Sequence, residues 1–322
     1  TDEGSEAFGC RQGPVGGAAL SRELHHVYRQ VVGKMRLASP RRMDIMYAVQ
    51  LLSRSLAAPQ WRHWVQPRHL ARYLKGTIDY RQVLEPTKEN PFRIEAWSDS
   101  DYAGDAESRK SVSCSVVGLN GAIVHGHSCQ QTIVATSSAE AEYYVLASTA
   151  VDVLGLRAML LEFSLQVTAV IRCDSTSGRA LANRQGLGRT RHIDVKLRWL
   201  QDVVARGLLR LAWVSSADNP ADLGTKALQR DRHEALTSRV GLVADGDVGL
   251  VDEVLVVDDS VEDSCGSSGA SSSEAAWSPL DVVVALAIGS VGGAIWLLGG
   301  WLVRALRAPS VQSMAEVATQ TT

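Results

Sequence analysis

The chain has 322 residues, 45% of them hydrophobic and 21% charged, and a formal net charge of −2. These values are ordinary for a folded protein with a sizeable core, and they exclude a chain that binds polyanions through its net charge alone. The five cysteines form no CxxC pair, which argues against a disulfide scaffold and a zinc site and fits a reducing compartment.

The first third of the chain predicts a Gly-rich disordered segment followed by helices. We expect disorder over residues 1–27 and a helical region over 28–90, in which "MDIMYAVQLLSRSL" and "QWRHWVQPRHLARYLKG" repeat apolar residues at helical spacing. The second stretch ends at Gly76. Residues 21–81 carry a large excess of Lys and Arg, which fits either an anionic partner such as nucleic acid or a solvated helix face.

A region of predicted strands follows. "FRIEAW" alternates like a strand and runs into a cluster of aspartates, and "SVSCSVVGL" and "AIVHGHS" are two further strands. Asn120 and Gly121 separate the last two strands, which is the strongest short hairpin signal in the chain. We therefore expect three strands joined by hairpins.

Helices and strands then alternate. Ser137 opens a long helix, with Glu140 at capping-box spacing, and "TAVIRC" and "LLRLAWV" are strands. Short helices are expected over 175–184 and 192–207, and a last helix opens at "DNPADLGTKAL", with Asn219 as its N-cap and Pro220 in its first turn. This order predicts an α/β fold with a mixed sheet and flanking helices.

The C-terminal quarter differs in composition. Residues 243–278 are acidic and rich in Ser and Gly, as expected of a flexible linker. Residues 282–303 contain no charge, so we predict a single transmembrane helix over 279–304, followed by a short tail over 305–322. The alternative is a buried apolar helix, but nothing nearby in the sequence offers a surface to bury it.

Four acidic residues fall where strands and helices meet: Asp99, Glu142, Asp174 and Asp222. In a mixed sheet these positions can converge on one rim. Hard oxygen ligands without a thiolate or imidazole cluster suit Mg²⁺ or Mn²⁺ rather than zinc. Two such ions about 4 Å apart activate a water and stabilise the leaving oxygen in phosphodiester hydrolysis.

Each acid also has an ordinary structural explanation. Asp222 can favour a helix dipole, and Asp174 can be a turn residue at a strand end. Asp101 and Asp105 are expected to be solvated loop acids, while Glu140 is accounted for by the cap. Taken singly each of the four favours the structural explanation, but together, in this order of elements, they favour a site.

The chain resembles the ribonuclease H region of copia-type retrotransposon polyproteins, preceded by the tail of the reverse transcriptase. The stretches that carry the resemblance are "MDIMYAVQLLSR", "ARYLKGTIDY", "WSDSDYAGDAESRKSVS", "QQTIVATSSAEAEYYVLAS", "IRCDSTSGRALA", "RTRHIDVKLRWLQD" and "SSADNPADLGTK". They occur in the order of the family and cover roughly residues 28–226.

The resemblance implies a ribonuclease H-like fold over 91–242, with a five-stranded mixed sheet, and cleavage of the RNA strand of RNA–DNA hybrids. It implies that Asp99, Glu142, Asp174 and Asp222 are the catalytic quartet that holds two Mg²⁺ ions. We place His192 near the nucleic acid and expect the hybrid backbone to contact basic residues beside the site, namely Arg109, Lys110, Arg191 and Lys196, as well as the basic helices of 29–75.

Three departures from the family pattern stand out. Cys114 occupies a position usually held by glycine, so the second strand is expected to pack differently. Gly224 occupies a usually apolar position and weakens that helix start by roughly 1 kcal/mol. The aromatic-histidine pair usual after "HID" is missing. None of these departures removes a carboxylate.

Three hypotheses follow. The first is a metal-dependent ribonuclease H. The second is a decayed remnant, tethered to a membrane, that binds nucleic acid without cutting it. The third is a membrane-tethered scaffold. The paired aspartates of a polymerase are absent, so the missing polymerase part of the polyprotein is an expected partner. A tail anchor would leave the main domain in the cytosol, although Arg304 and Arg307 after the span favour the opposite orientation.

Overall fold

The computed structural model describes residues 17–88, 91–184 and 195–245. The span predicted over 279–304, the tail over 305–322 and most of the linker lie outside these residues. So do Arg191 and His192, two of the predicted nucleic-acid contacts. Nothing in the described part therefore bears on the membrane segment.

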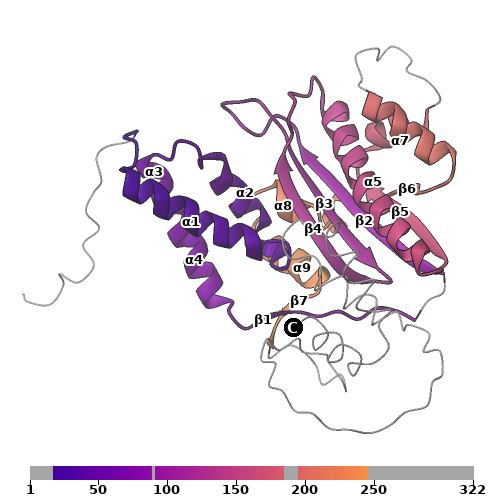
Figure 1. Cartoon of the computed structure of the whole chain (residues 1–322), viewed down its shortest axis with the longest axis horizontal. Coiled ribbons are helices and arrows are strands. Elements are labelled where there is room, and N and C mark those ends of the chain that lie inside the picture. The colour runs from indigo at the N-terminus through magenta and orange to yellow at the C-terminus, as the bar shows by residue number, and fades with distance from the viewer. Residues whose placement is uncertain (1–16, 89–90, 185–194, 246–322) are drawn as a thin grey trace, which may run out of the picture.

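A five-stranded mixed sheet forms the centre of the molecule (Figure 1). Its order is β4-β3-β2-β5-β6, with β2 antiparallel to β3 and parallel to β5. The strands are β2 (Phe92–Asp101), β3 (Val112–Leu119), β4 (Ala122–Gln130), β5 (Val167–Cys173) and β6 (Arg210–Trp213). The five-stranded mixed sheet expected from the sequence is confirmed.

The hairpin between β3 and β4 turns where the sequence predicts. Asn120 and Gly121 have φ angles of 49° and 93°, the left-handed conformation that a two-residue hairpin loop requires. The Asn120 side chain also accepts a hydrogen bond from the backbone N–H of Arg93, at 2.7 Å. The turn is thereby fixed to the start of β2, which sets the register in which Asp99 lies opposite Cys114.

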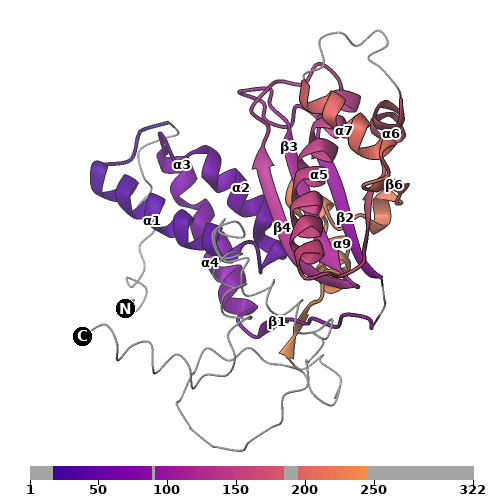
Figure 2. The same ribbon diagram turned by 45° about the vertical axis from the view of Figure 1, so that its right-hand side comes forward.

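One face of the sheet is covered by α5 (Ser138–Glu162), α6 (Thr176–Asn183) and α7 (Val195–Ala205), as Figure 2 shows from a second side. The core beneath them combines strand residues such as Ile94 and Ile171 with helix residues such as Leu146 and Leu200. In the described ranges, α5 alone is long and apolar enough to cross a membrane by length and composition. Its burial against the sheet explains that apolar character.

The start of α5 only half confirms the predicted capping box. The Ser137 hydroxyl accepts from the N–H of Glu140, as expected. The Glu140 carboxylate, however, accepts from the backbone N–H of Thr136 at 2.7 Å rather than from that of Ser137. The carboxylate therefore reaches one residue further back and ties the preceding loop to the helix.

The opposite face of the sheet is covered by two short helices and two segments from the N-terminal region. These are η1 (Met43–Ile45), α2 (Met46–Arg54), α8 (Asp222–Thr225) and α9 (Arg230–Arg239). Gly126 of β4 permits the contact, since a Cβ there would lie 3.0 Å from the sulfur of Met43 and 3.1 Å from that of Met46. Helices that precede the sheet in sequence thus share a core with it.

The last helix differs from its prediction. Asn219 does not cap it: its side-chain amide donates to the carbonyl of Ser98 at 3.1 Å, and its side-chain oxygen accepts from the N–H of Ala221. The helix α8 begins only at Asp222 and has four residues, and α9 follows separately. Asn219 instead anchors this loop to β2, next to Asp99.

The N-terminal helices form a second core, made by α1 (Arg22–Ala38), α2, α3 (Trp61–Trp64) and α4 (Gln66–Gly76). The prediction of disorder up to residue 27 is wrong from Arg22 onward. Tyr28, Val32 and Met35 recur at helical spacing and are buried, and Ser21 accepts from the N–H of Leu24. The strongly charged surface of α1 hides this apolar stripe in the sequence.

A small two-stranded ribbon joins the segment that precedes the five-stranded sheet to the segment that follows α9. Strand β1 (Tyr80–Gln82) pairs antiparallel with β7 (Leu242–Ala244), and Tyr80 lies opposite Ala244. β7 extends past residue 242, where the linker was expected to begin. The ribbon lies at the lower end of the molecule in Figure 1.

Candidate functional site

Three of the four predicted carboxylates meet at one rim of the sheet. Asp99 lies near the end of β2, Asp174 directly follows β5, and Glu142 lies in the second turn of α5. Because β2 and β5 are parallel neighbours, they end at the same edge, where α5 also begins. One oxygen of each of these three residues lies within 4.8 Å of the others.

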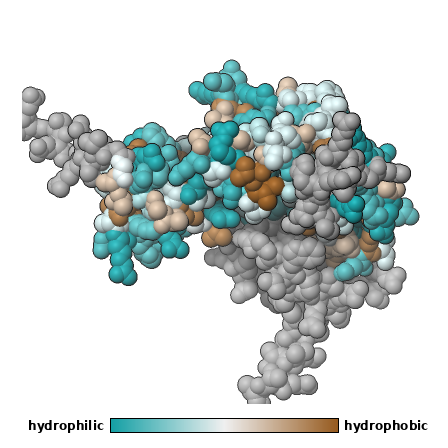
Figure 3. All heavy atoms as spheres, turned by 90° about the horizontal axis from the view of Figure 1, so that it is seen from above, coloured by the Kyte–Doolittle hydropathy of each residue, from teal (hydrophilic) through white to brown (hydrophobic). Residues whose placement is uncertain are grey.

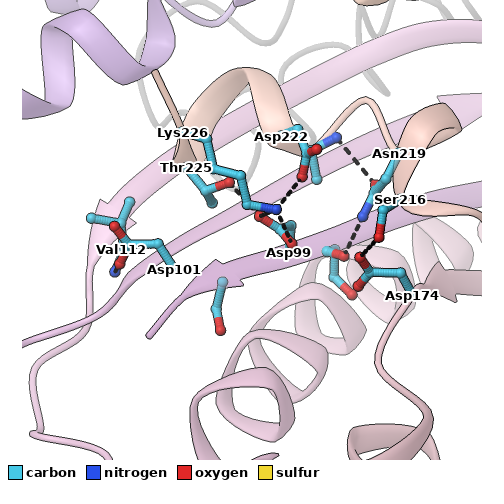
Figure 4. Close-up of polar contacts among 12 residues, drawn as sticks. Asp99, Asp101, Val112, Asp174, Ser216, Asn219, Asp222, Thr225 and Lys226 are labelled. Atoms are coloured by element: carbon cyan, nitrogen blue, oxygen red, sulfur yellow. Dashed lines mark hydrogen bonds and ion pairs between the residues drawn. The ribbon is translucent and has the colours of Figure 1, made fainter. Parts of the chain in front are cut away.

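Asp99 is almost completely buried, with 2% of its surface exposed. Its carboxylate accepts a hydrogen bond from the Thr225 hydroxyl and lies 3.3 Å from the ammonium nitrogen of Lys226 (Figure 4). Burial raises the pKa of Asp99 to about 6, against the opposing effect of Lys226, and the nearby Asp222 raises it further. The site thus holds a carboxylate whose charge is poorly compensated.

Glu142 is the least satisfied of the carboxylates. Its Oε1 accepts from the backbone N–H and the hydroxyl of Ser100, at 3.3 and 3.2 Å. Its Oε2 is buried and has no hydrogen-bond partner. Burial raises the pKa of Glu142 to about 8, and the charges of Asp99 and Asp174 act in the same direction.

Asp174 is half-buried, and the Ser216 hydroxyl donates to its Oδ2 at 2.5 Å. Ser216 belongs to the 3-10 turn η2 (Ser216–Asp218), which follows β6. The hydroxyl fixes Oδ2, and within the described residues no side chain donates a hydrogen bond to the other oxygen, Oδ1. Figure 4 shows Asp174 and Ser216 on the side of the site opposite to Lys226.

The fourth predicted residue, Asp222, lies beside this cluster but is engaged differently. It is 1% exposed, and its Oδ1 lies 2.7 Å from the ammonium nitrogen of Lys226. Its Oδ2 accepts from the guanidinium of Arg232. Both oxygens of Asp222 therefore already contact cations, and Asp99 shares Lys226 with it, whereas within the described residues Glu142 and Asp174 form no ion pair.

Sequence reasoning missed the residues that hold the carboxylates: Ser100, Ser216, Thr225, Lys226 and Arg232. For one of these residues, Lys226, the spacing in the sequence indicates a contact. Lys226 stands four residues after Asp222, the spacing at which side chains meet on a helix. The serines and Arg232 come from separate segments, and their approach depends on tertiary packing that spacing does not encode.

The two aspartates that follow Asp99, Asp101 and Asp105, shape the loop after β2. Asp101 accepts from the N–H groups of Gly104 and Val112, at 3.3 and 3.0 Å, so it belongs to the turn as predicted. Gly104 is required there, because a Cβ would lie 1.8 Å from the Asp101 carboxylate. Asp105 is not merely solvated: Gln130 and Ser108 donate to it.

The predicted nucleic-acid contacts are only partly within the described residues. Arg109 is exposed and has a φ of 56°, and Lys110 is half-buried beside it, both in the loop between β2 and β3. Lys196 lies in α7, but its side chain is outside the described part. Seen from above in Figure 3, the visible surface over the N-terminal helices is mainly hydrophilic.

The three clustered carboxylates suit a hard divalent cation. They supply oxygen ligands from three different elements, and one buried oxygen, Oε2 of Glu142, lacks any partner of its own. A buried polar atom without a partner is costly, and a bound cation would satisfy it. In the described ranges no ion pair reaches Glu142 or Asp174, so no cationic side chain there compensates their charge.

The raised pKa of Glu142 predicts an unusual pH dependence of stability. The folded protein keeps this proton up to a pH of about 8, while the unfolded chain loses it near 4.5. The unfolded state therefore binds fewer protons between these values, and stability falls as pH rises. We expect the free energy of unfolding of the metal-free protein to fall by up to about 2 kcal/mol from pH 6.5 to 8.

Urea unfolding in EDTA at pH 6.5, 7.25 and 8 measures this slope. Near pH 6.5 the buried histidines His125 and His127 act in the opposite direction, because burial lowers their pKa below the unfolded value of 6.5, so the slope is read in the window from pH 7.25 to 8. A stability that stays constant or increases across the window would contradict the protonated state of Glu142.

Comparison with known proteins gives matches that each cover about two-thirds of the chain. The chain is 34% identical over 218 residues to the retrovirus-related Pol polyprotein of transposon TNT 1-94 from Nicotiana tabacum. It is 32% identical over 219 residues to that of transposon RE2 from Arabidopsis thaliana. Each match covers 67% of this chain but only 16% and 15% of the relative, so the chain spans about a sixth of their length.

No model of a protein family matches the chain. Among solved structures, LC11-RNase H1 in complex with an RNA/DNA hybrid is similar over 41% of this chain and 93% of its own, with 18% identity and a TM-score of 0.30. The N-terminal RNase H domain of rv2228c from Mycobacterium tuberculosis also gives a TM-score of 0.30, with 18% identity over 45% of this chain and 96% of its own. Scores this low carry no argument.

Proposed function

Because the chain is homologous over two-thirds of its length to the retrovirus-related Pol polyproteins of copia-type transposons, we propose that it carries a ribonuclease H-type hydrolase. The substrate is the RNA strand of an RNA–DNA hybrid, and the cofactor is a divalent cation, Mg²⁺ or Mn²⁺. The observation that carries this proposal is the meeting of three carboxylates from β2, α5 and β5 within 4.8 Å.

Each side chain has a distinct task in this proposal. Asp99, Glu142 and Asp174 hold the cation, which when bound activates a water and stabilises the leaving oxygen of the phosphodiester. The Ser100 and Ser216 hydroxyls keep Glu142 and Asp174 in orientation through the hydrogen bonds described above. The cation binds because the protein supplies too little positive charge of its own to compensate these carboxylates.

Substrate binding is proposed to rest on the backbone of the hybrid. Arg109 and Lys110 extend the rim that carries the carboxylates, since their loop leaves β2 two residues after Asp99. Contacts of this kind neutralise phosphates and are therefore sensitive to salt and insensitive to sequence. The ribose 2′-OH distinguishes the RNA strand from the DNA strand.

The remainder of such a polyprotein, including its polymerase part, is a proposed partner. Membrane attachment through residues 282–303, with the main domain in the cytosol, stays a prediction, because those residues lie outside the described part.

Cleavage of a labelled RNA–DNA hybrid by the full chain tests the proposed activity. With Mg²⁺ we expect cleavage of the RNA strand, and we expect Asp174→Asn to reduce the rate at least ~10³-fold, because it removes a charge that holds the cation. Asp202→Asn is the matched control: Asp202 is an exposed residue of α7 that pairs only with Arg206, and its variant should cut like the wild type.

The absence of cleavage by the wild-type chain, with the hybrid still bound at low salt, would overturn the hydrolase. It would favour the alternative in which the chain is a remnant that binds nucleic acid and has lost its catalytic activity. Equal cleavage by the wild type and Asp174→Asn would instead place the activity outside this rim.

A further inference from the structure

A lysine occupies the space between two of the four carboxylates. Lys226 follows α8, and its ammonium nitrogen lies 2.7 Å from Oδ1 of Asp222 and 3.3 Å from the carboxylate of Asp99. Figure 4 shows the side chain descending from α8 with its tip between the two acids. The two carboxylates are 1% and 3% exposed, so the ammonium compensates charge that solvent does not reach.

The other oxygens of this pair are also satisfied. Oδ2 of Asp222 accepts from Arg232, and Oδ2 of Asp99 accepts from the Thr225 hydroxyl. A divalent ion between Asp99 and Asp222 would have to displace the ammonium group and at least one further donor. The Lys226 side chain is 41% exposed, but displacing its ammonium group is costly because two buried carboxylates would lose their cationic partner.

At the other side of the rim, the carboxylates of Glu142 and Asp174 lack cationic partners in the part of the chain that the structure describes. Glu142 has a buried oxygen without a partner, and within the described residues neither Glu142 nor Asp174 forms an ion pair. Glu142 and Asp174 are therefore the two carboxylates of the rim that lack a cationic partner within the described residues. Asp99 lies close to them but shares Lys226 with Asp222.

The balance of charges at the rim also favours one divalent ion rather than two. Once a bound cation displaces the proton of Glu142, four ionised carboxylates face two cationic side chains, Lys226 and Arg232, so one divalent ion neutralises the rest. A second divalent ion would leave excess positive charge in a largely buried cluster, at a substantial electrostatic cost.

We propose that the ammonium group of Lys226 is a built-in cation that takes the place of one divalent ion between Asp99 and Asp222. The rim then binds one divalent ion per chain, at Asp99, Glu142 and Asp174. This inference rests on the proposed function and replaces the two ions expected from the sequence with one ion and one ammonium group. Lys226 acts through Asp99 and Asp222 and is therefore a positioning residue.

The test is the number of Mn²⁺ ions bound per chain, measured on the full protein by isothermal titration calorimetry and by the loss of the free Mn²⁺ signal in electron paramagnetic resonance. We expect one ion for the wild type and two for Lys226→Met and Lys226→Gln, which remove the charge. Lys226→Arg keeps a cation and should bind one ion. Lys75→Met, at an exposed position of α4, is the matched control and should also bind one.

The outcomes separate this inference from the proposed function. Two ions on the wild type, or one ion on both neutral variants, would overturn the role of Lys226 and leave the metal-dependent hydrolase standing. No bound ion on the wild type would overturn both. The stoichiometry of the wild type can overturn the inference even if one variant fails to fold, and it does not depend on cleavage, while either neutral variant that folds tests the role of Lys226.

Discussion

Replacing Glu142 by glutamine is expected to abolish cleavage of the hybrid and, at the same time, to stabilise the metal-free protein at pH 8. Cleavage falls at least ~10³-fold because the neutral amide cannot hold the cation beside Asp99 and Asp174. Stability rises by roughly 1–3 kcal/mol because the variant no longer buries a carboxylate that is close to its raised pKa of about 8.

Two measurements on the same preparation check this pair of effects: the rate of hybrid cleavage with Mg²⁺, and urea unfolding in EDTA at pH 8. The control is Glu140→Gln, two residues earlier in α5, because the Glu140 carboxylate accepts from Thr136 and lies outside the carboxylate cluster. That variant should keep cleavage. A Glu142→Gln variant that cuts within tenfold of the wild type would remove Glu142 from the site.

The second large effect concerns the contact between β3 and α8. A Cβ on Gly224 would lie 2.4 Å from the sulfur and 2.9 Å from the Cβ of Cys114, which is completely buried. Gly224→Ala is therefore expected to destabilise the protein by roughly 2–3 kcal/mol through overpacking. Cys114→Gly alone should also destabilise it, by roughly 2 kcal/mol, because it leaves a cavity in a central strand.

The double variant Cys114→Gly with Gly224→Ala is expected to be more stable than the sum of the single changes predicts. The coupling should be at least about 1 kcal/mol in urea unfolding, because the new methyl group enters the space that the sulfur vacates. Gly33→Ala in α1 is the control, since nothing lies within 4 Å of its added Cβ, and it should be neutral or stabilising. Strict additivity of the two single changes would contradict the packing argument.

These two residues also explain two departures of the sequence from its family pattern. Taken separately, Cys114 predicted altered packing of the second strand and Gly224 predicted a weak helix start. In the structure they are one feature, because the larger residue on β3 fills the space left by the smaller residue on α8. A single sequence read position by position does not reveal that the two changes compensate.

The sheet and three clustered carboxylates were predictable because their signals are local. Strand alternation, the Asn120–Gly121 turn and acids at element ends are each visible within a few residues, and the parallel pairing of β2 with β5 then brings Asp99 and Asp174 together. The surroundings of Asp222 were not predictable. Arg232 reaches it from α9, a helix whose apolar positions are too few to show periodicity in the sequence.

The same reason accounts for the missed start of α1, Arg22 to residue 27, and for the ribbon of β1 and β7. Tyr28 and Val32 are apolar positions in a mainly polar segment, and their burial depends on α2, whose Leu52 carbonyl accepts from the Tyr28 hydroxyl. Strands of three residues carry almost no pattern, and their partners lie more than 160 residues apart. Contacts made only after distant segments pack leave little trace in local composition.

Because β1 pairs with β7, the chain enters and leaves the sheet domain at the same end. The chain enters through β1, passes to the start of β2, and returns through β7 beside its own entry point, with Tyr80 opposite Ala244. Asp99 lies at the other end of β2, and Figure 1 shows the ribbon far below the rim. Segments inserted at this entry and exit point would be attached away from the carboxylates, whereas η1 and α2 pack on the sheet itself and cannot be exchanged without changing that core.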